Sequence, residues 1–274
     1  MTAELLVNVT PSETRVAYID GGILQEIHIE REARRGIVGN IYKGRVSRVL
    51  PGMQAAFVDI GLDKAAFLHA SDIMPHTECV AGEELREGQH VKVYVVDVME
   101  TERGPRMMIS RTHPGLVKRM FEMEVPEIFD GTVEIKAISR EAGARTKMAV
   151  WSKDENVDPV GACIGPRGQR VANIVEELGG EKIDIVRWSE DPAQFISAAL
   201  SPATVVGVEL LEGDTKSCRV TVPDHQLSLA IGNKGQNARL CARLTGYNID
   251  IRPESGYYGE EPPMKKTPEP AAEE

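Results

Sequence analysis

The sequence IGPRGQR at residues 164–170 recurs as IGNKGQN at residues 231–237, so this chain of 274 residues contains two Gly-x-x-Gly loops with matching flanks. The two copies are 67 positions apart. Around each loop the apolar residues predict the same order of elements: helix, strand, strand, helix, loop, helix and strand. The repeat therefore predicts two copies of one small domain, at residues 113–189 and 190–253.

The flanking segments predict the individual elements. A helix is expected to begin at Pro114, with an apolar face formed by Leu116, Val117, Met120 and Phe121. The other helices and strands expected in the two units cover residues 132–139, 146–151, 159–164, 169–178, 182–188, 192–200, 205–211, 218–222, 226–231, 236–245 and 248–252.

Each loop has the chemistry of a phosphate-binding turn. Glycine lets a sugar-phosphate backbone approach without a clashing Cβ, and the helix that follows presents unsatisfied N–H groups to the same loop. A basic residue lies inside each loop, and an arginine follows near the start of the next helix. This arrangement predicts a clamp for about four nucleotides of single-stranded RNA, as in KH domains. The alternative is that the two loops are ordinary helix caps. The expected contacts are Gly165, Pro166, Arg167, Gly168, Arg170, Gly232, Asn233, Lys234, Gly235 and Arg239.

The part of the chain before Pro114 reads as short strands. Strands are expected at residues 5–9, 14–20 and 23–29, and then between residues 39 and 110, with Gly- and Pro-containing turns between them. Several short strands at this spacing predict a small antiparallel barrel. A loop is expected at residues 74–87, because this stretch is rich in Pro, Gly and Glu.

The composition limits the classes of function. The net charge of −10 argues against a protein that coats nucleic acid non-specifically, although residues 232–249 contain no acid. The four cysteines are scattered, so neither a zinc site nor a disulfide framework is expected. No signal peptide and no apolar run long enough for a membrane span is found. A cytoplasmic protein without cofactor, metal or membrane partner is expected, ending in a disordered acidic tail at residues 254–274.

From about Leu85 to Pro253 the chain resembles the NusA family of bacterial transcription termination and antitermination factors. The resemblance rests on VKVYVVDV (91–98), SRTHPGLV (110–117), ACIG (162–165) and LAIGNKGQN (229–237). It implies the end of an S1-type barrel followed by two KH domains of the bacterial type, type II. It also implies binding of nascent RNA in association with RNA polymerase and other transcription factors. The polymerase-contacting N-terminal domain of that family has no counterpart here.

Residues 1–84 instead resemble the N-terminus of ribonuclease G, of the ribonuclease E/G family. The segments NIYKGRV (40–46), QAAFVDIG (54–61) and AAFLH (65–69) carry this resemblance, which also implies an S1-type barrel. Phe57 and Phe67 match the aromatic RNA-contacting face of that family, and the alternative is that they are core residues. Lys43, Arg45 and Arg106 are expected to line the same groove, and the alternative is that they form only a solvated face. The two resemblances meet near Glu84–Leu85, inside one barrel, so packing across this join is the least certain part of the fold.

The expected fold class is therefore α+β and multidomain. It consists of N-terminal strands (1–38), an S1-type OB-fold barrel (39–112), two type II KH domains (113–189 and 190–253) and the tail. The expected function is non-enzymatic binding of single-stranded RNA in transcription elongation, termination and antitermination. The alternative is a ribonuclease E/G-type RNA processing factor that lacks its catalytic domain, since the metal-binding carboxylates and the zinc link of that family have no counterpart. A third reading is that the combination of the two families has no evolved role.

Overall fold

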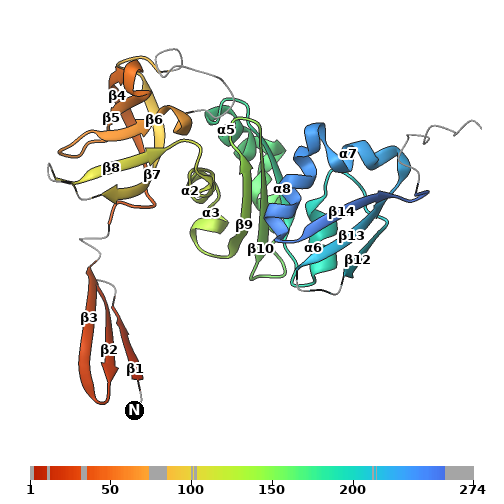
Figure 1. The fold of residues 1–274 in the computed structure, drawn as a ribbon, viewed down its shortest axis with the longest axis horizontal. Helices are drawn as coiled ribbons and strands as arrows, with labels where there is room; N and C mark the ends of the chain where they lie inside the picture. The colour runs from red at the N-terminus through yellow and green to blue at the C-terminus, as the bar shows by residue number, and fades with distance from the viewer. Residues whose placement is uncertain are drawn as a thin grey trace, which may run out of the picture.

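The computed structural model describes residues 3–10, 13–31, 36–73, 85–99, 101, 104–211, 213 and 215–256. Within these residues the chain forms a three-stranded sheet, a closed barrel and two α/β units, which follow one another in Figure 1. The predicted α+β class is confirmed, and so is the order of a five-stranded barrel before two α/β units, which are called the first and second KH units after the prediction. Most of the predicted loop at 74–87 and most of the predicted acidic tail lie outside the described residues.

The first sheet is an antiparallel meander. It contains β1 (Ala3–Val9), β2 (Glu13–Asp20) and β3 (Ile23–Arg31), in the order β1–β2–β3. Gly21 and Gly22 connect β2 to β3 with φ angles of 58° and 79°, which glycine adopts without a steric penalty. The three predicted strands are thus confirmed, and Figure 1 shows their sheet standing apart from the barrel.

The barrel closes in the order β4–β5–β6–β8–β7. Its strands are β4 (Ile41–Leu50), β5 (Ala55–Asp59), β6 (Ala66–His69), β7 (His90–Met99) and β8 (Arg106–Ser110). The predicted small antiparallel barrel is confirmed, with one exception among its strand pairs, because β6 and β8 run parallel. A ring of five strands cannot reverse direction at every pair, so one pair has to be parallel.

The barrel core is continuous across the predicted join at Glu84–Leu85. Leu85, Val91 and Val93 pack in one buried cluster with Val46 and Val58, which come from the other side of the join. The side chains alternate along the strands, so that Ala56 and Val58 point inward from β5 while Phe57 between them is partly exposed. One core thus accommodates both halves of the barrel.

The first KH unit begins with α2 (Pro114–Glu124), whose buried residues are the four that the sequence predicts. Its sheet has the order β11–β10–β9, with β10 antiparallel to β9 and parallel to β11. The sequence missed the short helix α3 (Pro126–Phe129), which lies between α2 and β9. The remaining elements are β9 (Val133–Glu141), β10 (Arg145–Ser152), α4 (Pro159–Ile164), α5 (Gln169–Glu177) and β11 (Lys182–Arg187).

The second KH unit repeats this arrangement. Its sheet order is β12–β13–β14, again with one antiparallel and one parallel pair around the middle strand. The elements are α6 (Pro192–Ala199), β12 (Gly207–Leu211), β13 (Ser217–Val222), α7 (Leu227–Ile231), α8 (Gln236–Thr245) and β14 (Asn248–Pro253). The repeat predicted from the two loops is therefore present at the level of sheet topology. No helix in the described residues combines the length and apolar composition that a bilayer crossing requires.

The two KH units share a core. Ala149 and Val186 from the first sheet pack in one cluster with the helices of the second unit, and Figure 1 shows α8 between the two sheets. Lys147 is fully buried at this contact, where its ammonium donates to the carbonyl oxygen of Ser201 at 2.6 Å and lies 3.2 Å from Asp184. A buried ammonium with these partners fixes one position of the second unit on the first.

A second buried ion pair joins the barrel to the first KH unit. The guanidinium of Arg140 binds both carboxylate oxygens of Glu181, at 2.9 and 2.8 Å, and the two side chains are only 3% and 0% exposed. Arg140 also donates to the carbonyl oxygens of Arg111 and His113, in the segment between barrel and α2. Stacking of the His113 ring on Tyr94 of β7, with ring centroids 4.7 Å apart, adds to this junction.

The surroundings of Glu181 determine its charge. Burial by itself raises the pKa of this carboxyl, but Arg140 and the hydrogen bonds from Thr146 and the Gly143 amide outweigh it and hold the pKa below its ordinary value of 4.5. A carboxyl with a depressed pKa in the folded state contributes stability above its unfolded-state pKa. That contribution is lost as the pH falls through the folded-state pKa.

We expect Glu181→Gln to lower the free energy of unfolding by about 3 kcal/mol at neutral pH, because Arg140 loses its buried counter-charge. The difference from the unsubstituted protein should shrink as the pH falls below 4.5, because the unfolded chain then binds a proton at Glu181, and it should vanish once the pH is below the depressed folded-state pKa. Urea unfolding followed by circular dichroism at several pH values measures both effects. Glu177→Gln, which removes a half-exposed pair with Lys92, is the control and should cost less than about 1 kcal/mol. An equal cost for the two variants would contradict the assignment.

Candidate nucleic-acid interface

The two Gly-x-x-Gly loops have the same backbone. Gly165, Arg167 and Gly168 have φ/ψ of 74°/176°, 53°/24° and 76°/12°. The equivalent residues of the second loop have 75°/171°, 49°/31° and 74°/16°. All of these φ angles are positive, and the combination at the first glycine is open only to glycine. The loops are thus two copies of one strained turn. Their shared conformation extends over three residues, whereas an ordinary helix cap needs only one residue with positive φ.

Close packing explains the first glycine of each loop. A Cβ on Gly165 would lie 2.6 Å from the Cγ of Arg170, and one on Gly232 would lie 2.8 Å from the backbone nitrogen of Asn237. The second glycine of each loop has no such close contact, so its positive φ is what requires glycine. These residues bring the start of α5 and of α8 against the loop that precedes it.

The tip of each loop faces solvent. Pro166 and Arg167 are exposed in the first loop, and Asn233 and Lys234 are exposed in the second. No side chain caps the N-terminus of α5 or of α8, so the first N–H groups of each helix have no side-chain acceptor. Ile164 and Ile231, immediately before the loops, are 38% and 37% exposed. Each loop therefore combines a cation, a helix N-terminus without a side-chain cap and an apolar surface, which together suit a nucleotide.

The two arginines expected on the following helices have protein partners. Arg170 donates to Glu127 at 3.0 Å and to the carbonyl oxygen of Ala162 at 2.7 Å. The equivalent residue in the second unit is Asn237, which is buried and donates to the carbonyl oxygens of Leu200 and Ala230. At both positions the side chain holds the preceding helix end against the loop. The structure thus gives Arg170 a positioning role, and its contact with RNA stays a prediction.

Arg239 lies at the contact between the two KH units. Its Nε donates to Glu141 of the first unit at 3.1 Å, and its Nη1 donates to the carbonyl oxygen of Lys234 in the loop. Gln236 donates to the other oxygen of Glu141 at 2.9 Å. Burial raises the pKa of the Glu141 carboxyl, but these donors lower it by more, so the group is held charged. Arg239 therefore connects the second loop to the first KH unit, a role that sequence reasoning missed.

The aromatic residues predicted on the barrel face outward. Phe57 and Phe67 are cross-strand partners, with ring centroids 5.9 Å apart in an edge-on arrangement, and neither belongs to the barrel core. The guanidinium of Arg106 lies 5.9 Å from the centre of the Phe67 ring. The alternative reading of these two residues as core phenylalanines is therefore wrong. Arg48, which the sequence analysis did not single out, pairs with Phe57 from β4 and extends the same row.

Lys43 is not part of this row. On β4, Lys43 is the cross-strand partner of Lys92 on the neighbouring strand β7, whereas Arg48, farther along β4, is the partner of Phe57 on β5. Lys92 in turn forms an ion pair with Glu177 of the first KH unit at 3.0 Å. The structure thus brings Phe57, Phe67 and Arg106 together and places Lys43 beside Lys92, where β4 pairs with β7.

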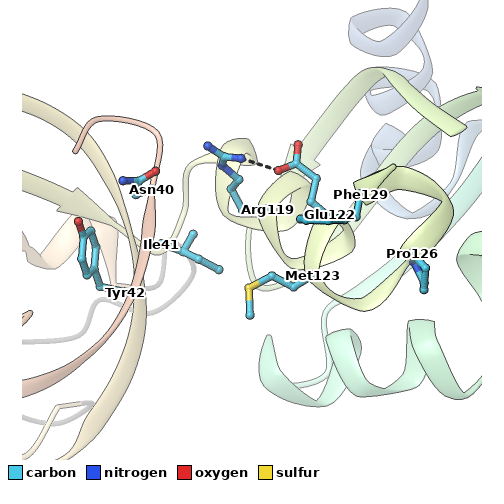
Figure 2. A pocket seen from close by; sticks show the side chains of 8 residues that line it. All are labelled: Asn40, Ile41, Tyr42, Arg119, Glu122, Met123, Pro126 and Phe129. Atoms are coloured by element: carbon cyan, nitrogen blue, oxygen red, sulfur yellow. Dashed lines mark hydrogen bonds and ion pairs between the residues drawn. The ribbon is translucent and has the colours of Figure 1, made fainter. Parts of the chain in front are cut away.

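A pocket with a volume of about 690 Å³ lies where the barrel meets α2 and α3. Figure 2 shows Ile41 and Met123 pointing toward each other across it, while Arg119 and Glu122 pair at its rim. The lining residues are Asn40, Ile41, Tyr42, Arg119, Glu122, Met123, Pro126 and Phe129. The pocket is largely apolar, and the paired rim charges leave it without a reactive group.

The described residues contain no group of three or more His, Cys, Asp or Glu side chains that is able to hold a metal ion. Burial raises the pKa of the Cys163 and Cys241 thiols to about 12, so neither is a nucleophile at neutral pH.

Three family models match successive parts of the chain. The S1 RNA binding domain matches residues 37–110, the NusA-like first KH domain residues 111–188, and the NusA-like second KH domain residues 192–258. The transcription termination/antitermination protein NusA of Halalkalibacterium halodurans is 51% identical over 231 residues, which cover 82% of this chain and 58% of that protein. NusA of Bacillus subtilis is 48% identical over 229 residues, covering 82% of this chain and 60% of that protein. The chain thus spans about three fifths of the length of these relatives.

The second resemblance is also found. Ribonuclease G of Escherichia coli is 75% identical over 126 residues, which cover 42% of this chain and 26% of that protein. Residues 1–84 are less than a third of the chain, so this match extends beyond Glu84. The NusA matches cover too much of the chain to begin at Leu85. The two similarities therefore overlap instead of meeting at one point.

We expect Gly232→Ala to lower the free energy of unfolding of the second KH unit by about 3 kcal/mol, because it combines a glycine-only conformation with a backbone clash. Gly246→Ala is the matched control, since Gly246 has the left-handed φ of 74° but nothing within 4 Å of an added Cβ. Its cost should be about 1 kcal/mol. Chemical unfolding measures both, and a cost for Gly232→Ala no larger than that of the control would show that the loop does not need this close approach.

Proposed function

Residues 37–258 carry the S1 domain and the paired KH domains of the NusA family, and from this premise we propose that the chain binds single-stranded RNA as a transcription termination and antitermination factor. The observation that carries the proposal is the pair of loops with one backbone conformation, each presenting an exposed cation, Arg167 or Lys234. Neither cation forms an ion pair within the described part of the chain. Both are therefore available to phosphate at little cost.

The fixed arrangement of the modules supports binding of one strand by several sites. The buried contacts of Lys147 and Arg140 hold the two KH units and the barrel to one another. When one site has bound the strand, the others meet it at a high effective concentration. Modest contacts at each loop are therefore sufficient for useful affinity.

The barrel contributes a different kind of contact. The outward rings of Phe57 and Phe67, with Arg106 beside them, provide a stacking surface for bases, and stacking makes little demand on sequence. The KH loops would then hold the backbone while the barrel holds bases. Association with RNA polymerase and other transcription factors is the further part of this proposal, and it rests on the names of the relatives.

Replacing both loop cations, in Arg167→Asp/Lys234→Asp, should weaken binding of a short A-rich RNA strand by more than about tenfold and make the affinity less salt-dependent, since two phosphate contacts are lost. Fluorescence anisotropy at several salt concentrations measures both quantities. The control Lys118→Asp/Lys182→Asp makes the same change in net charge at two exposed lysines outside the loops, and it should leave most of the affinity. Equal losses for the two double variants would reduce the loop contribution to a general charge effect.

The barrel variant Phe57→Ala/Phe67→Ala separates stacking from charge in the same assay. It should lower the affinity at every salt concentration while leaving the salt dependence almost unchanged, because no phosphate contact is removed. An unchanged affinity would remove the barrel face from the binding surface without affecting the loops.

The alternative function, RNA processing of the ribonuclease E/G type, is tested by activity. We expect no cleavage when the purified chain is incubated with magnesium and a 5′-monophosphorylated RNA, because the similarity to ribonuclease G covers 26% of that enzyme and the described residues lack a metal cluster. Gel analysis of the RNA over time is the measurement. Cleavage that remains after removal of contaminating nucleases, and that scales with the amount of chain, would overturn this proposal.

A further inference from the structure

The N-terminal sheet of β1, β2 and β3 exposes many large apolar side chains to solvent. Leu5, Leu6, Val7 and Val9 of β1 are exposed, and so are Ile23, Leu24, Ile27 and Ile29 of β3. The alternation along the strands puts apolar side chains on both faces of the sheet. A three-stranded sheet with uncovered apolar faces is only marginally stable in water. We therefore expect another surface to cover it or a further strand to extend it.

The edge formed by β1 is the unprotected one. All seven of its residues are exposed, and its sequence, AELLVNV, contains no Pro or Lys and only one charge, Glu4. The opposite edge strand, β3, carries Glu26 and His28, which interact with each other at 2.8 Å. Charges of this kind discourage further strand pairing, whereas a long apolar edge without them invites it. The free edge for an additional strand is therefore that of β1.

We propose that two copies of this chain pair through β1, antiparallel and about a twofold axis that passes through Leu6. Leu6 is the middle residue of the strand, so only this register uses all seven residues of both copies. It places Leu6 opposite Leu6 of the second copy, Leu5 opposite Val7, and Ala3 opposite Val9. The result is one continuous sheet of six strands, with β3 of each copy at its two outer edges.

The sequence of β1 suits this pairing on charge as well as on shape. Glu4 lies opposite Asn8 of the second copy, so no two carboxylates face each other directly across the axis. Directly opposed side chains point to the same face of an antiparallel sheet, about 4.5–5.5 Å apart at Cβ, so the apolar row of Leu5, Val7 and Val9 continues into the second copy. The pairing thus shields the sides of the exposed apolar residues of β1 and satisfies its open N–H and C=O groups.

This inference stands apart from the proposed RNA binding, although the two are compatible. A dimer formed through the N-terminal sheets would carry two sets of barrel and KH surfaces, which increases the number of contacts available to a long strand. Dimerisation is measured without RNA, so a failure of RNA binding leaves it untouched.

Sedimentation velocity of the full chain over a dilution series is expected to show a dimer, at twice the chain mass of 30.0 kDa, that dissociates on dilution. Leu6→Lys places two ammonium groups against each other on the axis and should raise the dissociation constant at least about tenfold. The matched control is Leu24→Lys on β3, because Leu24 is 53% exposed and Leu6 is 54% exposed in the same sheet. This control should leave the dimer intact.

Mixing provides a test of the axis itself. The variants Leu6→Lys and Leu6→Glu should each be monomeric alone, and an equimolar mixture should form a heterodimer, since opposite charges then meet across the axis. A monomeric unsubstituted chain at the highest concentration would overturn the proposal. So would a Leu24→Lys variant that dissociates as readily as Leu6→Lys, or a mixture that stays monomeric.

Discussion

The buried pair of Arg140 and Glu181 is the interaction on which the arrangement of the modules depends. Removing two charges from water is costly, and the cost is offset only because both side chains form further hydrogen bonds within the fold. Glu181 also accepts from the Gly143 amide and from Thr146, while Arg140 binds the carbonyl oxygens of Arg111 and His113. One ion pair thus joins three segments of the first KH unit to the segment that leaves the barrel. Its value lies in fixing an orientation more than in adding stability.

A buried charge with several polar partners also lies at the contact between the two KH units. Lys147 is buried there with an ammonium bound to Ser201 and Asp184, and Glu141 accepts from Gln236 and Arg239 at the edge of the contact. Directional polar contacts specify one docking position, whereas the shared apolar cluster around Ala149 provides most of the burial. The distance between the two loops is thereby set by the protein and does not have to be set by the RNA.

Local patterns in the sequence predicted much of this fold. The buried face of α2 and the repeated order of elements followed from periodicity, and the outward position of Phe57 follows from alternation along β5. Long-range outcomes did not follow. The parallel pairing of β6 with β8 depends on barrel closure, and the short α3 lies in a stretch without a clear period. The ion pairs of Arg170 with Glu127 and of Arg239 with Glu141 did not follow from the sequence either, because a flexible arginine side chain goes where an acceptor is. The contact of these arginines with RNA stays a prediction.

For the proposed RNA binding by an acidic chain, it matters which cations form ion pairs within the fold and which do not. The net charge of −10 opposes non-specific association with nucleic acid. Cations such as Arg140, Arg145 and Arg170 are neutralised by carboxylates within the fold, so they add little to the external field. Arg167 and Lys234 are exposed on glycine-rich turns, and within the described residues neither has such a partner. In the proposed function, these two cations are the ones that coincide with a backbone geometry that fits a phosphate. In this proposal the net negative charge of the chain and the two basic loops act together in selectivity.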